Sequence, residues 1–160
     1  MKLFKNQKSL EQDRLSFAAA EAVMSEAEFT TFLEMLRTEK SFLTEPRAKC
    51  LELLKYLAAP ESRFVSRRLR EKAAALVTVL QELKILTSTH FLVFPRNQTG
   101  NNLRHSLHPD YFILEMTNVS LDQHEFHLKA ERQLAQCVAA TGDCYREYRD
   151  AARRQLLKEE

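Results

Sequence analysis

The stretch of sequence that decides the fold runs from residue 63 to residue 116 and reads RFVSRRLREKAAALVTVLQELKILTSTHFLVFPRNQTGNNLRHSLHPDYFILEM. It starts with a basic turn at residues 63–70 and continues as an apolar-striped helix through Leu86. Two short apolar runs, at residues 90–94 and 111–116, then break the helical periodicity. Basic charge, a turn-rich loop and a sheet pattern coincide nowhere else in this chain.

The two apolar runs predict the strands of one antiparallel β-hairpin. Both are rich in aromatic and β-branched residues and both are flanked by turn residues. Each is apolar on both faces, and a bare two-stranded ribbon is marginal in water. We therefore expect helices to cover the hairpin. The polar loop at residues 95–109 is long enough to suggest a functional role.

The segments before this stretch have helix-start signals and helical spacing. Ser9-x-x-Gln12 and Ser25-x-x-Glu28 match the capping box. Thr44 is a candidate cap for a third helix, with Pro46 in its first turn, where a missing N–H does no harm. Ser62 is the candidate cap for the basic helix.

The segments after this stretch predict one long C-terminal helix at residues 120–158. Ser120-x-x-Gln123 is its capping box, and Gly142 lies inside its apolar stripe. The stripe steps by four and three residues through Leu134, Val138, Thr141, Tyr145, Tyr148 and Ala152. We expect the end beyond Tyr148 to project past the domain toward a partner or a second copy.

Tyrosine and arginine at the end of this helix are candidate partner-binding residues, because both types are enriched at protein–protein contacts. The candidates are Tyr145, Tyr148, Arg149 and Arg153.

Composition favours one mainly α domain over residues 1–160, with five or six helices and the small hairpin. Only 2 of the 160 residues are glycine, so the chain makes few positive-φ turns. A net charge of +2 gives no overall field for nucleic acid. No run approaches the length of a membrane span. Three cysteines without framework spacing suit a reducing, cytoplasmic setting.

The layout at residues 46–116 resembles the winged-helix arrangement: helices, then a strand, a long loop and a strand. The resemblance implies that the loop at residues 95–109 is the wing and that the basic turn at residues 63–72 contacts nucleic acid. The candidate phosphate-binding residues are Arg67, Arg68, Arg70, Arg96 and Arg104. The helix start at residues 71–75 holds almost no base-reading side chains.

The sequence contains no recognisable catalytic, metal or cofactor motif. His105-x-x-His108 and His124-x-x-His127 are the closest approach to a metal pair, and surface or capping histidines are the simpler interpretation. Two glycines 42 residues apart cannot form a phosphate-binding loop. We therefore predict no enzyme, no metal and no cofactor.

These observations favour a non-enzymatic helical adaptor, or a structural subunit of a larger assembly. It would bind a protein partner or associate with itself through the C-terminal helix. The alternative is a winged-helix-like nucleic-acid-binding protein. The sequence does not name the partner, the process or the oligomeric state.

Overall fold

The computed structural model describes residues 2–109 and 120–157 and is mainly helical, as predicted. The described residues form α1 (Lys2–Val23), α2 (Glu26–Glu39), α3 (Thr44–Ala58), α4 (Arg67–Thr89) and α6 (Leu121–Leu156). A 3₁₀ turn, η1, covers Pro60–Ser62. The strands are β1 (Ser41–Leu43), β2 (Phe91–Val93) and β3 (Arg104–Leu107).

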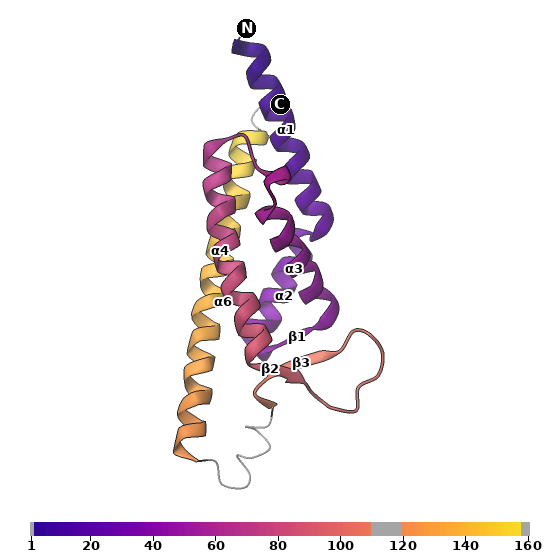
Figure 1. Ribbon diagram of the computed structural model, residues 1–160, viewed down its shortest axis with the longest axis vertical. Coiled ribbons are helices and arrows are strands. Elements are labelled where there is room, and N and C mark those ends of the chain that lie inside the picture. Colours follow the sequence, from indigo (N-terminus) through magenta and orange to yellow (C-terminus); the bar gives the residue numbers. More distant parts are fainter. Residues whose placement is uncertain (1, 110–119, 158–160) are drawn as a thin grey trace.

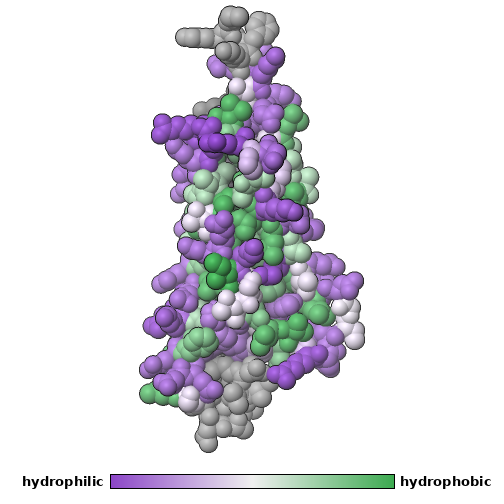
Figure 2. Space-filling model, in the orientation of Figure 1, coloured by the Kyte–Doolittle hydropathy of each residue, from purple (hydrophilic) through white to green (hydrophobic). Residues whose placement is uncertain are grey.

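The helices run along the long axis of the molecule, and the small sheet lies toward one end (Figure 1). α4 and α6 lie side by side and antiparallel, and they form the most extensive helix–helix contact. α2 and α3 complete the bundle, while α1 lies at the end away from the sheet. In the view of Figure 2, hydrophobic side chains gather along the middle of this face, with hydrophilic ones on its flanks.

The packing of α4 against α6 follows from matching stripes spaced by four and three residues. On α4 the buried positions are Leu69, Ala73, Leu76, Leu80, Leu83 and Thr87. On α6 the predicted stripe is buried from Leu134 to Ala152, and the helix continues through Gly142, so both predictions are confirmed. Spacing of this kind lets two helices keep one seam in contact over many turns.

Two of the predicted helix starts are confirmed. Ser25 and Ser120 form complete capping boxes with Glu28 and Gln123. The Ser9 prediction is wrong, because α1 begins at Lys2 and runs through that position.

The other two predicted caps are also wrong. Leu43 stands at the N-cap of α3, and the hydroxyl of Thr44 donates instead to Leu103 O at 3.0 Å. Ser66, not Ser62, caps α4, and its side chain accepts from Leu69 N.

The sheet has three antiparallel strands in the order β1-β3-β2. The predicted strand at residues 90–94 is confirmed as β2, but its partner β3 lies inside the predicted loop. β1, for which the sequence predicts no strand, pairs with β3. The second predicted strand, at residues 111–116, lies outside the described residues.

Within residues 46–109 the structure has α3, α4, β2, a loop and β3, with β1 as the third strand. The basic turn and the striped helix of the predicted winged-helix layout belong to one helix, α4, and the predicted second strand lies outside the described residues. The candidate wing is shorter than predicted, because β3 starts at Arg104. The turn between α3 and α4 begins at Pro60 and contains η1 and the segment before Ser66.

Candidate functional site

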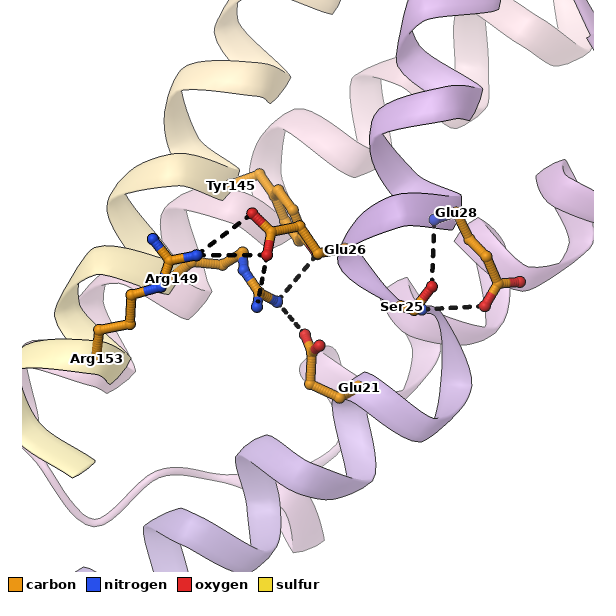
Figure 3. A network of polar contacts seen from close by, with 7 residues as sticks. All are labelled: Glu21, Ser25, Glu26, Glu28, Tyr145, Arg149 and Arg153. Carbon is orange, nitrogen blue, oxygen red and sulfur yellow. Dashed lines mark hydrogen bonds and ion pairs between the residues drawn. The ribbon is translucent and has the colours of Figure 1, made fainter. Parts of the chain in front are cut away.

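The end of α6 holds a polar network that ties three helices together (Figure 3). Arg149 is only 12% exposed and forms ion pairs with Glu21 at the end of α1 and with Glu26 at the start of α2. Its guanidinium also lies 5.6 Å from the ring centroid of Tyr145. Arg153 reaches Glu26 from the next turn, at 3.4 Å. A buried arginine with two carboxylate partners stabilises this junction, because its charge is matched.

The four predicted partner-binding residues are therefore close together, but their contacts lie within the chain. Tyr145 stacks on Phe29, with ring centroids 3.9 Å apart, and Tyr148 is 1% exposed. Of the four, Arg153 is the most exposed. A partner role for these residues stays a prediction. In this structure a partner could contact only the parts of these side chains that remain exposed.

The prediction that the tail projects past the domain is wrong. Ala151, Ala152 and Leu156 are buried. The carbonyl of Leu156 accepts two hydrogen bonds from Arg14 on α1, at 3.1 and 3.2 Å. The end of α6 therefore belongs to the core, and Arg14 holds it against α1.

A groove of about 500 Å³ lies between α2 and α6. We call it the α2–α6 groove. Its apolar lining is Phe29, Leu33 and Leu36 of α2 and Leu134, Ala135, Val138, Ala139, Gly142 and Tyr145 of α6. Ala135 and Ala139 are exposed in it. Three small residues on one face of α6 leave room above the helix that a larger side chain would fill.

Gly142 is not required by the packing of the chain itself. A Cβ added there would meet its nearest atom, Leu33 Cδ1, at 3.9 Å, which is ordinary contact. Glycine inside a helix costs about 1 kcal/mol relative to alanine. The residue therefore weakens α6 and keeps the groove open, with no compensating contact among the described residues.

Charged side chains line both rims of the groove, and they pair with one another. Lys40 meets Glu131 at 2.6 Å, and Arg146 meets Asp143 at 3.3 Å. Glu34 pairs with Arg37 on α2. A ligand entering the groove would find both signs of charge already matched, so its apolar contacts would decide binding.

The predicted phosphate-binding arginines fall into two groups at opposite ends of α4. Arg67, Arg68 and Arg70 lie at its start, while Arg96 and Arg104 belong to the loop and strand beyond its end. α4 has 23 residues, so the groups are separated by a helix about 34 Å long.

Several of these arginines are held by neighbours within the chain. Arg67 pairs with Glu71, and Arg104 pairs with Glu39. Arg70 donates to the carbonyls of Phe64 and Val65. The structure does not assemble the five arginines into one patch.

Three histidines form a hydrogen-bonded row that the sequence did not indicate. His90 Nδ1 lies 2.8 Å from His108 Nε2, and His108 Nδ1 lies 3.1 Å from His127 Nδ1. His127 Nε2 lies 3.0 Å from Glu131. The row joins the ends of α4 and β3 to α6. The two i, i+3 spacings in the sequence do not form it, because its members come from three elements. His127 is 3% exposed, so the interpretation as a surface histidine is wrong for this residue.

The row has one consistent set of protons when all three rings are neutral. Burial raises the pKa of Glu131, but the hydrogen bond and charge of Lys40 outweigh it and lower the pKa, so Glu131 is an acceptor. We therefore assign a proton to His127 Nε2, which leaves its Nδ1 to accept from His108. His108 Nε2 then accepts from His90 Nδ1. Every imidazole proton points along the row toward Glu131.

The cysteines are thiols with no sign of activation. Burial raises the pKa of Cys50 to about 12. Burial also raises the pKa of Cys137 and of Cys144. Within residues 2–109 and 120–157, no cluster of three His, Cys, Asp or Glu side chains is arranged to hold a metal ion.

Comparison of the chain with protein-family models, curated proteins and solved structures found no match. Among the helices that the structure describes, none combines the length and apolar character needed to cross a membrane.

Proposed function

We propose that this chain is a non-enzymatic adaptor or structural subunit that holds an amphipathic helix in the α2–α6 groove. The observation that carries the proposal is the open, apolar floor at Ala135, Ala139 and Gly142, which the described residues leave uncovered. Amphipathic helices bind such grooves through apolar anchors spaced at i, i+3, i+4 and i+7. We place this function in a reducing compartment, since all three cysteines are free.

The rims of the groove define the chemistry of the helix that fits. Because Lys40, Arg146 and their acidic partners already neutralise one another, a strongly charged peptide gains little there. Small residues on α6 favour close backbone approach, so the bound helix can place large apolar side chains over them. The matching ligand is a helix with an apolar stripe and mixed charges on its flanks.

The test is site-specific photo-crosslinking from position 139, with position 136 as the control. Both residues are exposed on α6, but only Ala139 lines the α2–α6 groove. A crosslinked protein, once identified, is purified and its affinity measured. Ala139→Glu should weaken binding by tenfold or more and Gln136→Glu should leave it unchanged, because only the first places a charge on the apolar floor. Equal effects of the two variants would contradict the proposal.

Nucleic-acid binding is the second candidate, and the strand order β1-β3-β2 next to α3 and α4 favours it. The outward positions Glu71, Ala74 and Ala75 of α4 offer few contacts to bases, so phosphate contacts would carry the affinity. Replacing Arg67, Arg68 and Arg70 together with alanine should then flatten the salt dependence of binding. Purified protein without excess absorbance at 260 nm and without salt-sensitive DNA binding would remove this candidate.

A further inference from the structure

The first part of α6 extends beyond the helix that forms the other wall of the groove. The end of α2 is marked by Lys40, which pairs with Glu131. The start of α2 is marked by Glu26, which pairs with Arg149. The two helices are therefore antiparallel, and residues 121–130 of α6 lie past the end of α2. We call these residues the α6 arm.

The α6 arm carries exposed apolar side chains in line with the groove. Leu121 is 73% exposed and Leu128 is 40% exposed. The same seven-residue spacing continues through Ala135 to Gly142 inside the groove. One face of α6 thus changes from large residues to small ones along its length. On a straight helix, residues seven apart lie on nearly the same side.

We infer that the helix held in the α2–α6 groove is the α6 arm of a second copy of this chain, in an antiparallel, two-fold symmetric dimer. This inference rests on the proposed function and names the partner. If Ala135 lies opposite Ala135 of the second copy, Leu128 lies opposite Gly142 of that copy. The symmetry repeats the contact, so each Leu128 fills the space over one Gly142.

The charges beside this seam are complementary in the same register. Lys129 and Glu125 of one chain come next to Asp143 and Arg146 of the other. Each meeting brings opposite signs together, and all four side chains lie on the surface. Such exposed pairs add little affinity, but they favour the antiparallel register over its alternatives. The size match at Leu128 and Gly142 supplies the apolar contact.

Sedimentation velocity over a concentration series tests the inference. Wild-type protein should form a dimer, and both Leu128→Lys and Gly142→Leu should weaken self-association by about tenfold or more. The control is Leu92→Lys, because Leu92 is also exposed, at 55%, but lies on β2. Leu128→Ala combined with Gly142→Leu exchanges the large and small residues, so this double variant should restore the dimer.

Disulfide trapping provides a second measurement that needs no change at position 142. In a Cys144→Ser background, Ala135→Cys should crosslink to itself across the two-fold axis, and Gln136→Cys should do so much more slowly. A wild-type protein that stays monomeric at 100 μM overturns the inference, and so does a dimer that persists in Leu128→Lys. Neither result decides the proposed function, which is tested separately by identifying the protein that crosslinks to position 139.

Discussion

The carboxylate of Asp13 on α1 accepts a hydrogen bond from the backbone N–H of Ser66, the residue that caps α4, at 3.0 Å. Its other oxygen accepts from the N–H of Val65 at 2.6 Å. Asp13 is 1% exposed, so its carboxylate depends on these amides for its hydrogen bonds. This one side chain joins the N-terminal helix to the turn between α3 and α4.

Removing this carboxylate should destabilise the protein. Asp13→Ala leaves two amides without an acceptor, and hydrogen bonds to a charged group contribute about 1.5–3 kcal/mol each. We expect the free energy of unfolding in urea to fall by roughly 2–4 kcal/mol. Asp13→Asn, which keeps one acceptor oxygen, should lose less. Glu11→Ala is the surface control, and a loss as small as that of the control would contradict this role.

Removing the hydroxyl of Tyr148 should not destabilise the protein, in contrast to removing the carboxylate of Asp13. This oxygen is buried and has no hydrogen-bond partner among the described residues. A buried polar group without a partner costs about 1–3 kcal/mol. Tyr148→Phe should therefore leave stability unchanged or raise it by up to about 1 kcal/mol, as read from the thermal midpoint. A clear loss of stability would mean that the hydroxyl has a partner in solution.

Deleting residues 149–160 should unfold much of the chain, contrary to what the sequence suggested. The deletion removes buried Leu156 and leaves Glu21 and Glu26 without Arg149. Burial of one leucine alone is worth about 1.5–3 kcal/mol. Circular dichroism should show a lower melting temperature for the deletion. The surface control Arg154→Ala should melt at the same temperature as the full chain. A deletion that melts like the full chain would place the tail outside the core.

Stability should fall as the solution is acidified below pH 6.5. Burial, and then the neighbouring His90 and His127, lower the pKa of His108 to about 4, against the opposing effect of Glu131. Between pH 6.5 and 4 the unfolded chain therefore binds more protons than the folded one. The contribution of neutral His108 to the free energy of unfolding is complete above pH 6.5 and is lost progressively down to pH 4.

The comparison of His108→Gln with His124→Gln isolates this effect. His90 and His105 also have a pKa lowered by burial, so part of the pH dependence should remain in the first variant. Urea midpoints measured from pH 7.5 to pH 4.5 should show a shallower slope for His108→Gln than for wild type or the control. Lys40 and Glu131 are charged groups at the His127 end of the row. Equal slopes for all three proteins would contradict the assignment.

The helices could be predicted because their causes are local. Ser25 and Ser120 each form a capping box with a residue three positions later, so the helix start can be recognised locally. The apolar stripe of α6 likewise repeats at about every turn. Thr44 misled the prediction because a threonine before a helix has the same local pattern whether its hydroxyl caps the helix or bonds a distant carbonyl. Here it bonds Leu103, 59 positions away.

The sheet was predicted only in part because two of its strands carry little sequence signal. β3 reads Arg-His-Ser-Leu, without an alternating apolar pattern. It forms because strands on both sides satisfy its backbone, and a central position lets a weak sequence adopt the strand. β1 is three residues long and joins two helices, which is shorter than periodicity can reveal.

The candidate site escaped prediction for a related reason. The groove lies between α2 and small residues of α6, and these two helices are more than 80 positions apart in the sequence. The row of His90, His108 and His127 likewise needs the ends of three elements to meet. In the sequence, only Gly142 pointed to this groove, because a glycine inside a long helix has no local reason.

The strand order also sets a timetable for folding during synthesis. β1 is made early, yet it pairs only with β3, whose residues follow about 60 positions later. β2 likewise waits for β3, so no part of the sheet can form until residue 107 has left the ribosome. Chains emerge at about 5–20 residues per second, which leaves β1 unpaired for several seconds and β2 for about one to three seconds. Their shortness, three residues each, limits what a neighbouring nascent chain could pair with during that interval.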